Sequence, residues 1–216
     1  MIPTVLKSVE EYLRDIEIHL IRGSHDARAD SASAEEYVVS LIQNANRWKV
    51  FSPNLGRADN RGWYDVRIRN YYINIKISTC TTTDNTNAKK AIFWLLTGIK
   101  PDDVPTGNKQ FFKLMRENES EDQRRDYFYL VINKTDPSDV FFVSLKGLAH
   151  CQLSPNNLPF QSNWDKCRKP VKRDWHEAKS FLLGKWAQSI QRAIELQQNG
   201  MPNVYPEYFQ KTTRIE

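Results

Sequence analysis

Apolar residues along this chain recur at two spacings, one typical of helices and the other of strands. A repeat every three or four positions predicts amphipathic helices over residues 8–22, from 33, over 87–97 and from 174. Alternation or crowding of aromatic and β-branched residues predicts strands in "RWKVFSPN", "GWYDVRIRNYYINIKIST", "YFYLVIN" and "VFFVSL". The order α-α-β-β-β-α-β-β-α predicts an α/β (α+β) fold, a mixed β-sheet flanked by helices on both faces.

Capping signals give the expected ends of these helices. Ser or Asp followed three residues later by Glu makes a capping box, and the pairs are Ser8–Glu11, Ser33–Glu36 and Asp174–Glu177. These pairs predict helix starts near residues 8, 33 and 174. Between the elements, "TTTDNTN" is expected to be a polar loop, "RENESEDQRRD" an exposed charged segment, and residues 153–173 irregular and basic.

Composition narrows the classes of protein that this chain can be. It carries a formal net charge of +5, which mildly favours a polyanionic partner such as nucleic acid. Three widely spaced cysteines indicate neither a disulfide framework nor a zinc site. No apolar run is long enough to span a membrane, and the N-terminus is charged too early for a secretory signal, so we expect a cytoplasmic protein without a membrane partner.

One face of the expected hairpin carries polar groups. Ile73, Ile75 and Ile77 alternate and fix one face of the second arm to the core, which leaves Asn74 and Lys76 on the other face. Pairing across the hairpin brings Asp65 beside them. A carboxylate that binds Mg²⁺, next to a lysine that orients water, suits phosphodiester hydrolysis, and the backbone carbonyl of Ile75 is a further candidate ligand. The alternative is an ordinary solvated sheet face.

The order of elements around this hairpin resembles the PD-(D/E)xK nucleases, and more narrowly the type II restriction endonucleases. "SAEEYVVSLIQ" is similar to the first core helix of that family, "WYDVRI" to the strand with the first acid, "INIKIS" to the (E/D)xK strand and "DNTNAKKAIFWLLTG" to the following helix. The resemblance covers about residues 30 to 145. It implies a restriction-endonuclease-like core, with Asp65 as the metal-binding aspartate and Lys76 as the catalytic lysine.

Two positions depart from the family pattern. Tyr64 stands where the family usually has proline, and Asn74 stands where it usually has a second acid. The missing charge requires another carboxylate at the metal, and Glu35 is the best candidate because a capping box would occupy Glu36. The alternative for Glu35 is a helix-dipole contact in the first turn of its helix.

Further residues are candidates for DNA contact. Ser78 extends the polar face of the hairpin. The segment "TCTTTDNTN", with Asn85 and Asn87, either holds a phosphate at a helix N-terminus or caps that helix through Asp84 or Asn85. The basic segment "KCRKPVKR" either contacts the DNA backbone or is a solvated loop; its cations are Lys166, Arg168, Lys169, Lys172 and Arg173.

Taken with the resemblance, the sequence predicts a Mg²⁺-dependent endonuclease that cuts a specific double-stranded DNA sequence. We expect a single nuclease domain over 1–216, with an N-terminal helix in 1–30, a catalytic core in 31–145 and a DNA-recognition or dimerisation region in 146–216. A palindromic target implies a homodimer. The alternatives are a structure-specific repair nuclease, such as a Holliday-junction resolvase, and a non-catalytic DNA-binding protein with a decayed site.

Overall fold

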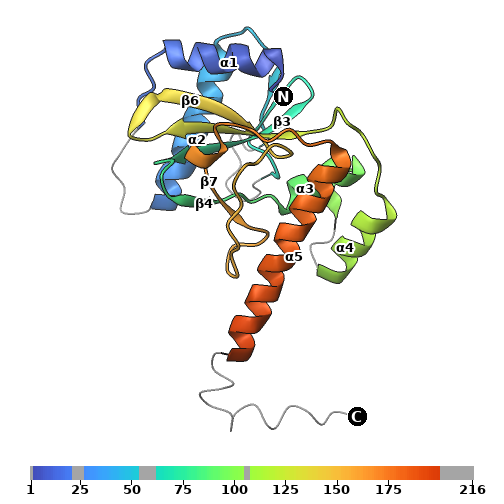
Figure 1. Ribbon diagram of the computed structural model, residues 1–216. Coiled ribbons are helices and arrows are strands. Elements are labelled where there is room, and N and C mark those ends of the chain that lie inside the picture. Colours follow the sequence, from blue (N-terminus) through green and yellow to red (C-terminus); the bar gives the residue numbers. More distant parts are fainter. Residues whose placement is uncertain (1, 21–26, 54–61, 105–107, 200–216) are drawn as a thin grey trace, which may run out of the picture.

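A mixed five-stranded sheet organises the molecule. The computed structural model describes residues 2–20, 27–53, 62–104 and 108–199 (Figure 1). The sheet has the order β1-β2-β3-β5-β6, with β3 parallel to β5 and all other neighbours antiparallel. Its strands are β1 (Val50–Phe51), β2 (Val66–Ile68), β3 (Tyr71–Ser78), β5 (Tyr127–Asn133) and β6 (Asp136–Ser144). The predicted fold class, a mixed sheet flanked by helices, is confirmed.

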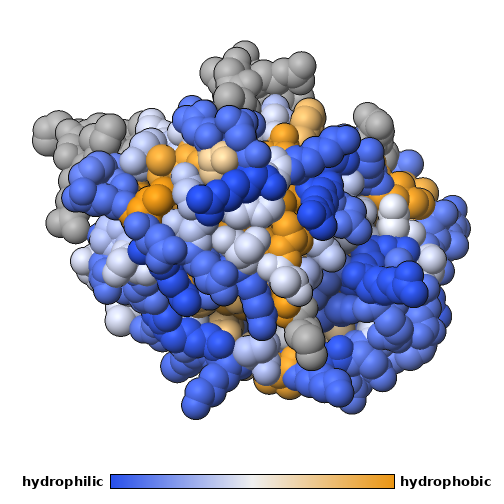
Figure 2. Space-filling model, turned by 90° about the horizontal axis from the view of Figure 1, so that it is seen from above, coloured by the Kyte–Doolittle hydropathy of each residue, from blue (hydrophilic) through white to orange (hydrophobic). Residues whose placement is uncertain are grey.

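Helices cover both faces of this sheet, and α1 and α5 lie on opposite sides of it in Figure 1. On one face, α1 (Thr4–Asp15) and α2 (Ala27–Asn44) pack on Ile73, Ile75 and Leu130. On the other face, α3 (Lys89–Thr97), α4 (Asn108–Glu117) and α5 (Trp175–Asn199) share a second core with Tyr72 and Tyr129. Seen from the α1 side, the surface is mainly hydrophilic, with apolar side chains visible in narrow strips (Figure 2).

A small second sheet joins the middle of the chain to its C-terminal part. β4 (Thr83–Asn85) pairs antiparallel with β7 (Gln161–Asn163). Two short 3-10 helices complete the described elements, η1 (Pro101–Asp103) and η2 (Asp165–Cys167). Phe160, Trp164 and Trp186 belong to the same core cluster as α3, so the region after residue 146 packs directly against the preceding core.

Several predicted elements agree with the structure. "YFYLVIN" is strand β5 from end to end, and Ile73 and Ile75 are fully buried, as their alternation predicted. The capping box before α5 is present, because the Asp174 amide donates to Glu177 at 2.9 Å and the Glu177 amide donates to Asp174 at 2.8 Å.

Other predicted boundaries are wrong. The first helix runs over Thr4–Asp15 instead of 8–22, since Pro3 precedes it and Ile16 is extended. α2 begins at Ala27, so Ser33 lies inside the helix and cannot cap it. The polar loop "TTTDNTN" contains strand β4. Helix α4 was not predicted at all.

Candidate active site

The β2–β3 hairpin brings Asp65 and Asn74 side by side. Val66 pairs with Ile73 in the ladder, so the preceding residue, Asp65, lies opposite Asn74. The Asp65 amide donates to the Ile73 carbonyl at 2.9 Å, and the Asp65 Oδ2 accepts the Ile75 amide at 2.7 Å. These two bonds lock the carboxylate onto the hairpin, although it stands one residue outside β2.

Lys76 is the charged centre of this face. Burial lowers the pKa of its ammonium, and the carboxylates of Asp65, Glu35 and Asp84, in decreasing order of effect, lie close enough to oppose that change. Acids from three separate segments, the residue before β2, helix α2 and strand β4, therefore act electrostatically on this lysine. Strand alternation also places Lys76 beside Val131 of β5, within the sheet face that α3 covers.

Asn74 carries a buried oxygen without a partner. Its Oδ1 has no hydrogen-bond donor within reach in the part of the chain that the structure describes. A buried acceptor of this kind costs free energy unless a ligand or water satisfies it. The position beside the Asp65 carboxylate makes this oxygen suitable for a hard cation, which prefers carboxylate and amide oxygens.

The resemblance implies a Mg²⁺ ion, and the residues at this site meet only the minimum requirement for holding one. Within residues 2–20, 27–53, 62–104 and 108–199, no group of three or more His, Cys, Asp or Glu could hold a metal. Magnesium, however, is commonly held by one or two carboxylates, with waters and substrate phosphates completing its shell. Asp65 with the Asn74 oxygen meets that minimum. The side chain of Ile75 is fully buried in the opposite core, so this residue can offer only its backbone.

Glu35 reaches the site for a different reason from the one that the sequence suggested. The predicted capping box at Ser33 is absent, because α2 continues back to Ala27. Glu35 is nevertheless partly buried and acts electrostatically on Lys76, whereas Glu36 is exposed. Its position two turns inside the helix also rules out the first-turn dipole contact.

Asp84 is an acid of this site that sequence reasoning missed. It lies on β4, and its Oδ2 accepts the Trp164 indole N–H at 2.7 Å. The sequence suggested Asp84 or Asn85 as the cap of α3, but that helix starts after Ala88 without a side-chain cap. The run of threonines before Asp84 was the available strand signal, whereas the pairing of Asp84 with Ser162 of β7, 78 positions later, left no local signal.

The candidate DNA contacts near the hairpin are partly engaged in the fold. Ser78 is buried, and its hydroxyl accepts the Cys80 amide at 3.0 Å. The Asn85 Oδ1 accepts the Asn87 amide at 3.0 Å, which forms a local turn, while Asn87 itself is exposed. Of these residues, Asn87 offers the most accessible side chain.

The basic segment divides into structural arginines and exposed lysines. Arg168 binds Asp139 through both terminal nitrogens and Asp165 through Nε. Arg173 donates to the carbonyls of Lys146 and Leu148 at 3.0 and 2.8 Å. The remaining cations of the segment are exposed: Lys166, Lys169 and Lys172.

An aromatic cluster closes the end of the face beyond Asp65. The rings of Trp63, Tyr72 and Trp94 lie 4.5 to 5.7 Å from one another, and the Tyr127 hydroxyl donates to the Trp63 carbonyl at 2.8 Å. Trp175 and Trp186 are buried in the same core. These ring contacts join the chain before Asp65 and the start of β3 to helix α3.

Comparison with known protein families and curated protein sequences found no match to this chain. None of the helices in the described ranges is long and apolar enough to cross a membrane. The arrangement around Lys76 therefore carries the functional argument.

Proposed function

We propose that this protein is a Mg²⁺-dependent endonuclease that hydrolyses phosphodiester bonds at a specific sequence in double-stranded DNA, of the type II restriction class. The observation that supports the proposal most is the grouping of Asp65, Asn74 and Lys76 on one hairpin face, with the Asn74 oxygen unpaired. The resemblance to PD-(D/E)xK nucleases rests on the same residues.

Each residue has a separate role in the proposed reaction. Asp65 and Asn74 would hold the magnesium ion, which when bound neutralises charge on the phosphate and lowers the pKa of a water. Lys76 donates hydrogen bonds to the attacking water or to a phosphate oxygen and stabilises the negative charge that develops there. The water oxygen bonds to phosphorus and the bond to the 3′ oxygen breaks. The attacking water releases a proton to solvent, and the leaving 3′ oxygen takes one up from solvent and departs as a hydroxyl.

Glu35 and Asp84 have supporting roles in this proposal. Both raise the pKa of the Lys76 ammonium against the effect of burial. A lysine that keeps its proton in a partly buried site retains its positive charge for the phosphate. Glu35 also remains a candidate to supply the carboxylate that Asn74 lacks.

A cleavage assay with plasmid and phage DNA tests the proposal. Discrete fragments with Mg²⁺ and none with EDTA are expected. Replacement of Lys76 by Met should lower cleavage about a hundredfold or more, since it removes a charge that stabilises the transition state. The matched control is Lys49→Met, which makes the same substitution at an exposed lysine.

Other outcomes of this assay would contradict the proposal. Selective cutting of branched DNA would instead indicate a structure-specific repair nuclease. Binding without cutting in any metal would indicate a decayed site. An active and folded Lys76→Met variant would refute the role given to the lysine.

A homodimer follows from the proposal if the recognition sequence is palindromic, because a two-fold protein axis then matches the two-fold axis of the DNA. Sedimentation with and without duplex measures this directly. A protein that stays monomeric on a palindromic duplex, and cuts its two strands in separate steps, would contradict the homodimer.

A further inference from the structure

A basic hollow lies at the turn end of the β2–β3 hairpin, away from Lys76. We call it the hairpin-end hollow; its volume is about 480 Å³. Five of its lining residues are cations: Arg125, which is held within the fold, and four others, Arg67, Arg69, Lys100 and Arg124. Tyr71 and Trp94 contribute aromatic rings to its wall.

These four cations have no acidic partner within the described ranges. None of the ion pairs formed there includes Arg67, Arg69, Lys100 or Arg124. Arg67 lies over the rings of Phe51 and Tyr72, at 5.2 and 6.0 Å from their centroids. Ring contacts leave the positive charge without a counter-charge.

The two acids that line the hollow are already engaged. Asp122 accepts the Arg124 amide at 2.8 Å and pairs with Arg125 at 3.8 Å. Asp126 is buried and accepts the Ser144 hydroxyl and the amides of Tyr127 and Lys146. The hollow therefore presents a net positive charge to any ligand that enters it.

Arg125 shows the contrast between a structural cation and these four. It is largely buried, and its Nη1 donates to the carbonyls of Leu95 and Ser120 at 3.1 and 3.0 Å. Such contacts fix the loop after α4. Arg69, Lys100 and Arg124 are exposed and make no comparable side-chain contact in the described residues.

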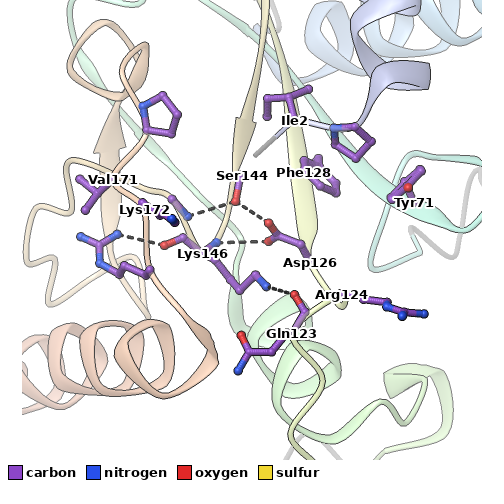
Figure 3. Close-up of a pocket in the computed structure, with 14 residues that line it drawn as sticks. Ile2, Tyr71, Gln123, Arg124, Asp126, Phe128, Ser144, Lys146, Val171 and Lys172 are labelled. Atoms are coloured by element: carbon purple, nitrogen blue, oxygen red, sulfur yellow. Dashed lines mark hydrogen bonds between the residues drawn. The ribbon is translucent and has the colours of Figure 1, made fainter.

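A second hollow of about 520 Å³ adjoins the first and shares Tyr71, Arg124 and Asp126 with it. In Figure 3, Tyr71 and Arg124 lie on one side of this hollow, and Val171 and Lys172 lie on the other. Lys146 is held by the Gln123 carbonyl at 2.8 Å, whereas Lys172 is exposed. The positive surface thus continues from the hairpin turn toward the segment before α5.

The hairpin-end hollow lies beyond the aromatic end of the candidate active site, because Tyr72 and Trp94 line it. Tyr72, which lines the hollow, is four positions from Lys76 on β3, roughly 13 Å at the rise of a strand, and Asn70 in the preceding turn is six positions from Lys76, roughly 20 Å. Successive phosphates of one strand in duplex DNA are about 3.4 Å apart along the helix axis. Phosphates of one strand bound in the hollow and at Lys76 would therefore be roughly four to six nucleotides apart.

We propose that the hairpin-end hollow is a phosphate-binding site that holds the phosphodiester backbone of nucleic acid. Arginine guanidinium groups bind phosphate oxygens in a bidentate way, and several separated cations suit a chain of phosphates better than a single ion. The choice of nucleic acid as the source of phosphate rests on the proposed nuclease function. The chemistry of the hollow itself does not depend on cleavage.

Binding measured in EDTA tests the site without any cleavage. The probe is a labelled duplex of about 30 base pairs, followed by fluorescence anisotropy over a range of salt concentrations. The variant is Arg69→Ala with Arg124→Ala, and the charge-matched control is Lys7→Ala with Arg192→Ala, two exposed cations on α1 and α5. All four residues lie at the surface, so the fold should be retained.

The arginine variant should bind about fivefold more weakly or worse, and its slope of log affinity against log salt should fall by about two. The control should stay close to the parent. Equal weakening in both double variants would overturn the proposal. A parent protein that binds duplex but never cuts it would refute the proposed function and leave the phosphate site in place.

Calorimetry with ATP and with inorganic phosphate separates the two sources of phosphate. No heat from either ligand, together with the loss of duplex binding, assigns the hollow to the nucleic-acid backbone. A binding heat with ATP that disappears in the arginine variant would overturn the backbone as occupant and assign the site to a free nucleotide.

Discussion

At the scale of single residues, Asn74 sets the chemistry of the candidate site. It occupies the position where the resembling family carries an acid, and its oxygen is buried without a donor in the described chain. The amide supplies an oxygen ligand but no charge, so affinity for a divalent cation should be lower than with two carboxylates.

Replacement of Asn74 by Asp should reduce the Mg²⁺ concentration for half-maximal cleavage by about tenfold, since ligand charge is a main determinant of metal affinity. Cleavage rates measured across a magnesium titration give this value. Asn118→Asp is the control, because Asn118 is exposed at the end of α4. An unchanged magnesium requirement would remove Asn74 from the metal site.

Asp126 gives a pH dependence of stability. Burial raises the pKa of its carboxyl above 3.8, in spite of three hydrogen bonds that favour the charged form. The folded protein then binds a proton that the unfolded chain has already released, so this contribution to stability is complete below pH 3.8 and is lost as the pH rises through the folded-state value.

In the Asp126→Asn variant, this loss of stability with rising pH should be absent. The difference in unfolding free energy, parent minus variant, should therefore decrease as the pH rises above about 4. Urea denaturation at several pH values measures it, with the exposed Asp15→Asn as control. A difference that stays constant with pH would show that Asp126 has the same proton affinity in both states.

The site residues on the hairpin could be predicted from the sequence. The site residues that other segments bring to the hairpin could be predicted only in part. Alternation alone put Asp65, Asn74 and Lys76 on one face. Glu35 was chosen through a capping box that does not exist. Asp84 was missed because its position depends on a strand pairing between distant segments, which leaves no periodic signal in the chain.

At the scale of elements, local signals were reliable where a segment is strongly patterned. The strand at Tyr127–Asn133 and the cap of α5 were both predicted correctly. The start of α2 was not, because residues 27–32 are mostly small or polar and offer no apolar stripe. Helix α4 was missed although its signal was present, because its buried residues Phe111 and Met115 stand four positions apart, as on one face of a helix.

Two glycines on helices should respond oppositely to alanine. Gly98 ends α3 with a φ of +74°, and an added Cβ would lie 2.7 Å from the Arg125 guanidinium. Gly184 lies within α5, where an added Cβ would meet no atom within 4 Å. Gly98→Ala should destabilise by about 1–2 kcal/mol or more, and Gly184→Ala should stabilise by about 0.5–1 kcal/mol.

Urea denaturation of the two glycine variants measures both effects in one experiment. Each variant serves as the control for the other, because the chemical change is the same. A destabilised Gly184→Ala variant would mean that α5 packs against a surface outside the described chain.

At the scale of the whole molecule, one sheet serves two cores. Ile73 and Ile75 of β3 face the cluster with α1 and α2, while Tyr72 of the same strand faces the cluster with α3 and α5. Both cores contain residues of β3 and β5. Loss of packing on one face of the sheet therefore weakens the strands on which the other core is built.

Unfolding should therefore be a single cooperative transition. Far-ultraviolet circular dichroism reports both sets of helices, and tryptophan fluorescence reports mainly the core that holds Trp164, Trp175 and Trp186. The two denaturation curves should coincide. Separate midpoints would show that the α1–α2 side and the α3–α5 side unfold independently.

The unpaired oxygen of Asn74 has a thermodynamic consequence for the proposed enzyme. A site with few charged ligands becomes complete only when a DNA phosphate adds its own oxygen. Metal and DNA must then strengthen each other's binding by the same factor, because linkage between two ligands is reciprocal. Such an enzyme would stay largely metal-free between encounters with DNA, and the substrate itself would assemble the active form.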